Sequence, residues 1–367
     1  MKKIIFSIIL LNFLNCNTLT TTDPATKTKE LEEILNARMA EDYDTTRSTR
    51  IFFGTNRKQT GEKPACSDQY FSVKHDDTVK YGFCDVSVPY LHDIGNLDFS
   101  PEDGKDKSFL FQSHLFNFTE SQWLEQVKAD PNDEIIVFVH GFNVKFEEAV
   151  LRAAQIKYDL KFRGNVVLYT WPAGAEEGFL NSILMNETYK DNFKNAEGSR
   201  NHFVKFMDSL INTDKKIHLI VHSMGHQVVL PSLDKIYKDR NKSFLRELIL
   251  NAPDFESVQF AYISHNLMKA SKRITVYCSP GDNALVASSK VNKNKRVGSC
   301  EKISGIDMIN VNPIDAPFLG VGGLGHGYYS SRPVLTDLFQ VILGIDARKR
   351  LFIRKSQERD EDFVLRR

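Results

Sequence analysis

The chain has 367 residues, a length typical of one large domain with appendages around a single core. Its 48 lysines and arginines nearly cancel its 47 aspartates and glutamates, which leaves a formal net charge of +1. A chain without a strong field of one sign is not suited to hold a polyanion, so the composition argues against a nucleic-acid partner.

The first residues have the pattern of an export signal. Lys2 and Lys3 precede a short apolar run that ends at Leu14. This run is too short to span a bilayer as a helix of the mature protein, whereas a basic start followed by a short apolar stretch is typical of a signal peptide. We therefore expect residues 1–15 to be removed and the protein to be exported to the cell envelope.

The signal is followed by a cysteine in a suggestive position. Phe13-Leu14-Asn15-Cys16 resembles a bacterial lipobox, in which the cysteine becomes the lipidated first residue, although most lipoboxes have glycine or alanine in place of Asn15. We expect a lipid anchor at Cys16 that holds the protein at a membrane, followed by a tether over residues 16–46. The alternative is a plain signal peptide with an incidental cysteine, which would make the protein periplasmic or secreted.

Four further cysteines are an even number in a compartment that permits disulfides. Pairing by nearest neighbour gives Cys66 with Cys84 and Cys278 with Cys300, and free buried thiols are the alternative. The sequence contains no CxxC and no HExxH, so it predicts no metal site, and we expect no cofactor.

Residues 47–345 alternate short β-branched and aromatic runs with stretches of helical period. This alternation predicts an α/β domain whose mostly parallel sheet is covered by helices on both faces. The expected strands, the first two of them antiparallel, are residues 50–55, 81–88, 134–140, 166–170, 217–223, 248–251, 274–278 and 306–311. The expected helices are residues 146–156, 192–210, 227–237 and 258–269.

Two segments lie outside this alternation. Residues 172–185 begin with small residues and continue with an apolar patch, which indicates either a lid over a site or an ordinary helical connection that packs on the core. Residues 346–367 mix positive and negative charges and are expected to form a solvated C-terminal tail.

Ser223 has the surroundings of a nucleophile. It lies in Val221-His222-Ser223-Met224-Gly225, between an expected buried strand and an expected helix. A sharp strand-to-helix turn lifts a serine hydroxyl clear of the sheet, and small residues are preferred two places on either side of that serine. Gly225 meets this preference, whereas Val221 would crowd the turn unless the packing helix gives way.

The loop His140-Gly141-Phe142-Asn143 follows the first unbroken apolar strand, and its glycine lets the chain pass close to a substrate. An oxyanion that forms when a serine attacks a carbonyl needs backbone N–H donors already aimed at it. We predict that these donors are the amides of Met224 and Phe142. His140 is expected to tie down the loop and not to act as the base.

The remaining triad members must come from later in the chain if the order is serine, acid, histidine. His265 lies in an expected helix, whereas His326 lies in a glycine-rich loop after the last expected strand, so we predict His326 as the base. Asp282 and Asp254 each follow a strand and could orient an imidazole. We favour Asp282 and keep Asp254 as the alternative acid.

Five segments together resemble a family of bacterial α/β-hydrolases of unknown function. They are His140-Gly141-Phe142-Asn143, Thr170-Trp171-Pro172-Ala173-Gly174, His222-Ser223-Met224-Gly225, Asn251-Ala252-Pro253-Asp254 and Gly325-His326-Gly327-Tyr328. The resemblance covers about residues 48–345 and implies an eight-stranded, mostly parallel sheet and an esterase-like Ser-His-Asp triad. One fold hosts many chemistries, so the resemblance names no substrate.

We interpret the chain as a serine hydrolase that cleaves carboxylic esters of small molecules or lipids through an acyl-enzyme on Ser223. Phe142, Trp171 and the apolar patch near Phe179 are expected to form an acyl-binding wall. Lipases, thioesterases, peptidases and acyltransferases share this machinery and are alternatives within the same class. The alternative from another class is a non-catalytic surface lipoprotein that binds ligands on a hydrolase scaffold. Val221, which departs from the nucleophile motif, supports this alternative. The presence of Ser223 and His326 in the order of a triad argues against it.

Overall fold

The computed structural model describes residues 47–61, 63–97, 107–175, 182–312, 326–357 and 362–366. The predicted signal peptide, Cys16, the tether and Phe179 lie outside these residues. The strands are β1 Ser48–Gln59, β2 Phe71–Ser87, β3 Leu110–Phe118, β4 Glu134–Val139, β5 Val166–Thr170, β6 Lys216–His222, β7 Leu245–Asn251, β8 Ser271–Cys278, β9 Asp307–Asn310, β10 Ile353–Lys355 and β11 Asp362–Leu365. The helices are α2 Glu120–Lys128, α3 Phe146–Asp159, α4 Ser182–Gly198, α5 Arg200–Ile211, α6 Gly225–Arg240, α7 Ser257–Ala270, α8 Asn283–Asn292 and α9 Arg332–Ile342, with 3-10 turns η2 Val297–Ser299, η4 Tyr328–Ser330 and η5 Ala347–Lys349.

A single twisted sheet organises the fold. Its strand order is β10-β11-β9-β8-β7-β6-β4-β5-β1-β2-β3. Of these eleven strands, the eight from β11 to β1 are mutually parallel, and β2, β3 and β10 extend the two ends through antiparallel pairs. Seven of the eight parallel strands were predicted, and β2 is antiparallel to β1 as expected, whereas the parallel strand β11 and the edge strands β3 and β10 were not expected.

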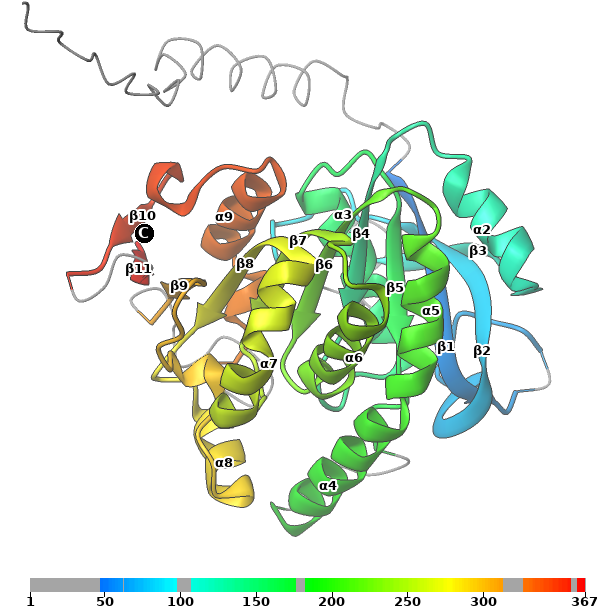
Figure 1. The fold of residues 1–367 in the computed structure, drawn as a ribbon. Helices are drawn as coiled ribbons and strands as arrows, with labels where there is room; N and C mark the ends of the chain where they lie inside the picture. Colours follow the sequence, from blue (N-terminus) through cyan, green and yellow to red (C-terminus); the bar gives the residue numbers. More distant parts are fainter. Residues whose placement is uncertain are drawn as a thin grey trace, which may run out of the picture. The chain divides into compact units, whose positions relative to one another are not determined.

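Helices cover both faces of the sheet, as Figure 1 shows. Side chains of β4 alternate between two cores: Ile135 and Val137 pack with α2, α5, α6 and α7, whereas Ile136 and Phe138 pack with α3 and α9. Burial on both faces explains why this strand reads as an unbroken apolar run in the sequence. Helix α8 follows the carboxyl end of β8 and, together with α4, extends below the sheet in Figure 1.

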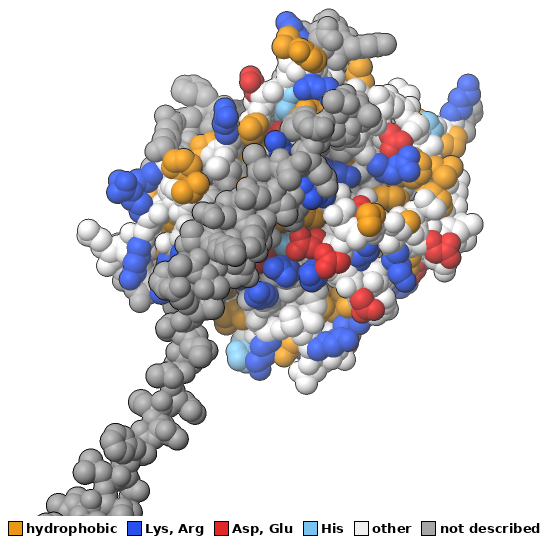
Figure 2. Space-filling view, turned by 90° about the horizontal axis from the view of Figure 1, so that it is seen from above, with side chains coloured by type: hydrophobic (Ala, Val, Ile, Leu, Met, Phe, Trp, Pro, Cys, Tyr) orange, Lys and Arg blue, Asp and Glu red, His pale blue; other side chains and the backbone are white. Residues whose placement is uncertain are grey.

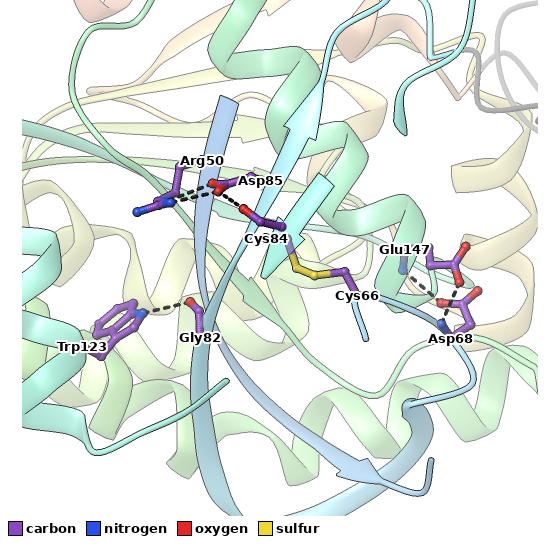
Figure 3. The surroundings of a disulfide bond; sticks show 9 residues. Arg50, Cys66, Asp68, Gly82, Cys84, Asp85, Trp123 and Glu147 are labelled. Atoms are coloured by element: carbon purple, nitrogen blue, oxygen red, sulfur yellow. Dashed lines mark hydrogen bonds and ion pairs between the residues drawn. A yellow bond between two sulfur atoms is a disulfide. The ribbon is translucent and has the colours of Figure 1, made fainter. Parts of the chain in front are cut away.

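Both disulfides expected from nearest-neighbour pairing are present. Cys66 bonds to Cys84, which joins the β1–β2 connection to β2, and Cys278 bonds to Cys300 across α8. Figure 3 shows the first of them beside a reciprocal contact in which the Asp68 carboxylate accepts from the Glu147 amide at 2.9 Å and the Glu147 carboxylate accepts from the Asp68 amide at 2.9 Å. The β1–β2 connection is thereby fixed to the first turn of α3.

The charged C-terminal segment is not a solvated tail, and that prediction is wrong. Strand β11 pairs in parallel with β9, and its Phe363 and Leu365 are buried. Arg350 donates to the Asp337 carboxylate of α9 at 2.9 Å, and both side chains are fully buried. One of the charges that made this segment look solvated, Arg350, is therefore buried in an ion pair with α9, and apolar residues of the segment complete the sheet edge.

Other differences concern elements with weak sequence signals. The single helix expected over 192–210 is two helices, because the chain is interrupted at Ser199 between α4 and α5. Helix α2 was not expected, although it begins with a capping box in which Thr119 and Gln122 satisfy one another's amides. Strands β3 and β10 and helices α8 and α9 were also not expected.

The outer surface carries mixed charge. Figure 2 shows positive and negative side chains interspersed on the face seen from above, in keeping with the balanced charge of the sequence. Within the described ranges, no helix is both long and apolar enough to cross a membrane.

Candidate active site

Ser223 stands in a strained turn between β6 and α6. Its φ is +50°, a region that non-glycine residues rarely occupy and that places the serine outside the path of the strand. A Cβ at Gly225 would approach the His140 carbonyl oxygen to 2.4 Å, so only glycine fits there. Val221 is buried in β6 beside Val139 and Leu250, and Ser223 takes the strained conformation in spite of it.

Three side chains from distant parts of the chain form a hydrogen-bonded series at this turn. His326 Nε2 lies 2.7 Å from Ser223 Oγ, and His326 Nδ1 lies 2.6 Å from Asp282 Oδ2. Asp282 is buried, whereas 17% of the His326 side chain is exposed. A buried carboxylate that fixes the imidazole on one side leaves its other nitrogen aimed at the serine, which is the arrangement of a serine-hydrolase triad.

Asp282 has a second contact that fixes its orientation. It is the N-cap of α8, and its Oδ1 accepts from the Leu285 amide at 3.1 Å. The two carboxylate oxygens therefore have separate partners, the helix and His326. This division holds the carboxylate plane in place.

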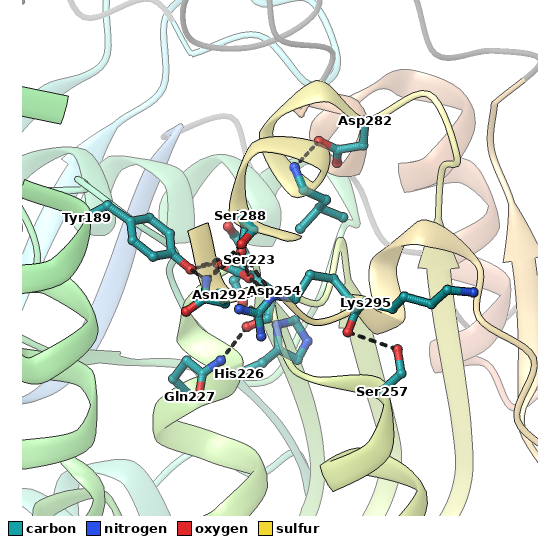
Figure 4. Close-up of polar contacts among 12 residues, drawn as sticks. Tyr189, Ser223, His226, Gln227, Asp254, Ser257, Asp282, Ser288, Asn292 and Lys295 are labelled. Atoms are coloured by element: carbon teal, nitrogen blue, oxygen red, sulfur yellow. Dashed lines mark hydrogen bonds and ion pairs between the residues drawn. The ribbon is translucent and has the colours of Figure 1, made fainter. Parts of the chain in front are cut away.

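Asp254, the alternative acid, belongs to a different network. Figure 4 shows it among side chains of α4 and α8: Tyr189 donates to Oδ2 at 3.0 Å, and Ser288 donates to Oδ1 at 2.5 Å. Arg296 Nε lies 3.2 Å from the same Oδ1, in an ion pair whose side chains are 3% and 4% exposed. Both oxygens of the Asp254 carboxylate are thus engaged by hydrogen bonds and an ion pair, and the carboxylate that contacts His326 is that of Asp282.

The predicted oxyanion loop lies directly against the nucleophile. A Cβ at Gly141 would come within 2.8 Å of Ser223 Cβ, so the absence of a side chain permits the close approach. Within the described part of the chain, neither the Met224 amide nor the Phe142 amide donates to another residue. Two backbone donors without partners next to a nucleophile are what an oxyanion hole requires.

Asn192 of α4 holds this loop in place, a role that sequence reasoning missed because no motif surrounds it. Its Oδ1 accepts from the amides of Asn143 and Gly174, and its Nδ2 donates to the Gly174 carbonyl at 3.0 Å. Asn143 has a φ of +57°. One buried amide side chain therefore joins the oxyanion loop to the loop after β5.

Trp171 does not have the predicted role in an acyl-binding wall. It is fully buried, and its ring stacks on His140 with centroids 5.4 Å apart. Its Nε1 donates to the His140 carbonyl at 3.0 Å. The aromatic face that was expected to contact a substrate instead supports His140. Phe142, in contrast, is half-buried and lies 5.9 Å from the Tyr189 ring.

Arg57 of β1 is a buried cation beside the oxyanion loop that sequence reasoning missed. Its guanidinium donates to the Thr170 hydroxyl at 2.9 Å, the Val144 carbonyl at 2.8 Å and the Ala173 carbonyl at 2.9 Å. Complete burial lowers its pKa to about 9, and the charge of Asp68 opposes this shift. Arg57 lies in the polar second half of β1, beyond the predicted strand, so the sequence held no signal that it is buried.

Three histidines near the nucleophile are held neutral. Burial lowers the pKa of His140 to about 3 with a further contribution from Arg57, and burial also lowers the pKa of His226 to about 3. His226 Nδ1 lies 2.6 Å from the Ser223 carbonyl oxygen. Burial and the neighbouring His326 hold the pKa of His222 well below its usual value, and its ring stacks on Tyr329 at 3.8 Å. None of these rings is placed to accept the serine proton.

Comparison with curated proteins gave no significant match, and comparison with solved structures gave none. A family model does match: "Alpha/beta hydrolase of unknown function (DUF900)" covers residues 117–344, more than half of the 367-residue chain. The matched range includes Ser223, Asp282 and His326 but not Arg57. With the sheet and the strand-turn-helix at Ser223 in place, this match shows that the chain belongs to that family of α/β hydrolases.

Proposed function

We propose that the protein hydrolyses carboxylic esters through an acyl-enzyme on Ser223. The observation that carries the proposal is the continuous hydrogen-bonded series from Asp282 through His326 to Ser223, with contacts of 2.6 Å and 2.7 Å. The serine has a base within reach, and the base has an orienting group, which are the two geometric requirements for an activated nucleophile.

The proposed reaction transfers the acyl group first to Ser223 and then to water. His326 Nε2 takes the Ser223 hydroxyl proton as Oγ bonds to the ester carbonyl carbon, and the carbonyl oxygen becomes an anion held by the Met224 and Phe142 amides. The tetrahedral adduct collapses, the C–O bond to the alcohol breaks, and His326 returns the proton to the departing alkoxide. Water then repeats the sequence on the acyl-enzyme, which releases the acid and restores Ser223.

The position of α6 adds to stabilisation of the anion. Met224 is the N-cap residue of this 16-residue helix, so its amide lies at the positive end of the helix dipole. Removal of one oxyanion donor typically costs about 10²- to 10³-fold in kcat. The attack on Ser223 therefore takes place where both the amides and the helix favour negative charge.

Covalent labelling tests the proposal. The folded protein without residues 1–16 is treated with a fluorophosphonate probe, and the modified peptide is mapped beside a Ser223→Ala variant. Ser264→Ala is the matched control, because Ser264 is buried in α7 and its hydroxyl donates to the Ala261 carbonyl. We expect labelling of wild type and Ser264→Ala at Ser223, and none of Ser223→Ala. A folded wild type that does not react would contradict the proposal.

A series of p-nitrophenyl esters graded by acyl length then separates the candidate activities. Turnover that depends on Ser223 supports ester hydrolysis, and its dependence on acyl length distinguishes a small-ester hydrolase from a lipase. Ligand binding without turnover would favour the non-catalytic lipoprotein. The proposed envelope location rests on the sequence of residues 1–16 and is tested separately below.

A further inference from the structure

Arg57 is a buried cation whose guanidinium hydrogen-bonds to no carboxylate among the described residues, although the charge of Asp68 acts on it. It is fully buried, and within the described residues its hydrogen bonds go to hydroxyl and carbonyl oxygens alone, on Thr170, Val144, Ala173 and Ser72. A buried cation is costly unless its surroundings use the charge. Its guanidinium bonds to the ends of the two loops that meet at His140, so its charge acts on the loop beside Ser223.

The hydrogen atoms between Arg57 and this loop can be assigned without ambiguity. A guanidinium only donates, so Arg57 Nε donates to Thr170 Oγ1 at 2.9 Å. A carbonyl only accepts, so the hydrogen of the 3.0 Å contact between His140 Nδ1 and the Gly141 oxygen lies on Nδ1. His140 is neutral near pH 7 because burial lowers its pKa to about 3, so its Nε2 has no hydrogen. The Thr170 hydroxyl must therefore donate to His140 Nε2, at 2.9 Å.

The series ends on the peptide group that supplies the oxyanion donor. The Gly141 carbonyl and the Phe142 N–H belong to one peptide unit. When that carbonyl accepts a hydrogen bond, the peptide becomes more polar and its N–H becomes a stronger donor, and each bond in a chain strengthens the next. The charge at one end of the series is thus connected through Thr170 and His140 to the Phe142 amide.

We propose that Arg57 and Thr170 are positioning residues that polarise the Phe142 amide through His140, and so strengthen the oxyanion hole. The proposal rests on the proposed function for its catalytic consequence. Both side chains act through other residues and not on the substrate itself. Arg57 polarises the Thr170 hydroxyl, Thr170 polarises the His140 ring, and His140 polarises the Gly141 carbonyl. The hydrogen bonds of Arg57 to Val144 and Ala173 additionally hold the loops that the series joins.

Thr170→Val tests the series, because it removes the hydroxyl and keeps the branched shape. Thr55→Val is the matched control, because Thr55 is equally buried and pairs with Thr170 in the sheet. Its hydroxyl donates to the Thr170 carbonyl at 2.6 Å and accepts from the Arg57 backbone amide at 3.1 Å, and neither contact is part of the side-chain series. With p-nitrophenyl butyrate we expect kcat to fall by about tenfold in Thr170→Val, less than for the loss of a whole donor, with KM nearly unchanged. Thr170→Ser should restore kcat, and Thr55→Val should retain it.

A spectroscopic measurement tests the same series without turnover. In protein labelled with ¹⁵N-phenylalanine, the Phe142 amide is assigned by its absence in Phe142→Leu. We expect its proton resonance to move upfield in Thr170→Val and in Arg57→Gln, since both weaken the polarisation, and to stay in place in Thr55→Val. Arg57→Gln provides an independent variant if Thr170→Val does not fold.

The outcomes separate the two proposals. Equal kcat and equal Phe142 resonances in Thr170→Val and Thr55→Val would overturn the series, whatever the activity of the wild type. An unreactive wild type whose Phe142 resonance still depends on Thr170 would refute the hydrolase proposal and support the polarisation. A loss of kcat in Thr170→Val that Thr170→Ser does not restore would assign the effect to packing and overturn the inference.

Discussion

Replacement of Asp282 by asparagine should abolish catalysis while leaving the fold intact. The reason lies in the division of its two oxygens: Oδ1 accepts from the Leu285 amide and Oδ2 faces His326 Nδ1. In the variant, the amide oxygen must keep the position facing the Leu285 N–H, because an NH₂ group there would oppose another donor. The NH₂ group is then forced toward His326 and donates to Nδ1.

The consequence is the wrong tautomer of the imidazole. A donor opposite Nδ1 leaves the ring hydrogen on Nε2, which faces the Ser223 hydroxyl at 2.7 Å and can no longer accept its proton. Loss of the correct tautomer costs about 10⁴-fold in kcat, which corresponds to about 5 kcal/mol in the activation barrier. Asparagine is as good an N-cap as aspartate, so α8 keeps its cap and the thermal midpoint should change by less than about 4 °C.

The matched control is Asp254→Asn, at the other aspartate that follows a strand. This change leaves the buried Arg296 without its anion, which typically costs about 3–5 kcal/mol of stability. Asp254→Asn should therefore lower the thermal midpoint markedly and retain most of its kcat while folded. Ester turnover and thermal unfolding, measured on both variants, give opposite patterns if the assignment is right.

The reverse pattern would refute this reasoning. If Asp282→Asn stays within tenfold of wild type with an unchanged midpoint, the contact between Asp282 and His326 does not set the tautomer. If Asp254→Asn is instead folded and inactive, the acid has been assigned to the wrong strand end.

Three further predictions concern other parts of the molecule. The pKa of buried His226 is about 3, below its value of 6.5 in the unfolded chain, so the unfolded state binds a proton first and stability present above pH 6.5 is lost as the pH falls. Between pH 7 and pH 5, the free energy of unfolding measured in urea should therefore fall by about 2 kcal/mol less in His226→Gln than in wild type. Equal falls in the two proteins would contradict this prediction. Joint replacement of Cys278 and Cys300 by serine opens a loop with a sequence separation of 22 and should cost about 3 kcal/mol, seen as a lower thermal midpoint than that of oxidised wild type; an unchanged midpoint would count against it. Mass spectrometry of the native N-terminus should find acyl groups on Cys16, and an unmodified or uncleaved terminus would remove the proposed anchor.

The sequence was sufficient for seven of the eight parallel strands and for Ser223 and His326, because these depend on local patterns. Buried strands read as apolar runs, and the strand-turn-helix at Ser223 has a short signature. The choice between Asp282 and Asp254 is different, since both follow strands and both precede helices. It is decided by Tyr189, Ser288 and Arg296, which come from distant segments and occupy Asp254. Local pattern contains no information about such partners.

The errors have the same origin. Trp171 was predicted to line an acyl-binding wall because its contacts with His140, made across neighbouring strands, leave no trace in the local sequence. The role of Arg57 was missed because three of its acceptors, on Val144, Thr170 and Ala173, lie 87 to 116 residues further along the chain. Arg350 was interpreted as part of a charged tail because its partner, Asp337, lies in helix α9, which was not predicted. Each is a polar or aromatic group whose role is set by tertiary neighbours.

The strands at the two ends of the sheet have a practical consequence for anyone who wishes to express the recognised region alone. A polypeptide limited to residues 117–344 would contain the whole triad but lack β1, β2, β10 and β11. Strand β5 would lose its partner β1, and β9 would lose its partner β11. Both would then expose rows of unpaired backbone groups, which invite pairing between molecules. Such a fragment is expected to aggregate, and a soluble fragment is expected to need the edge strands that lie outside the range of the family match.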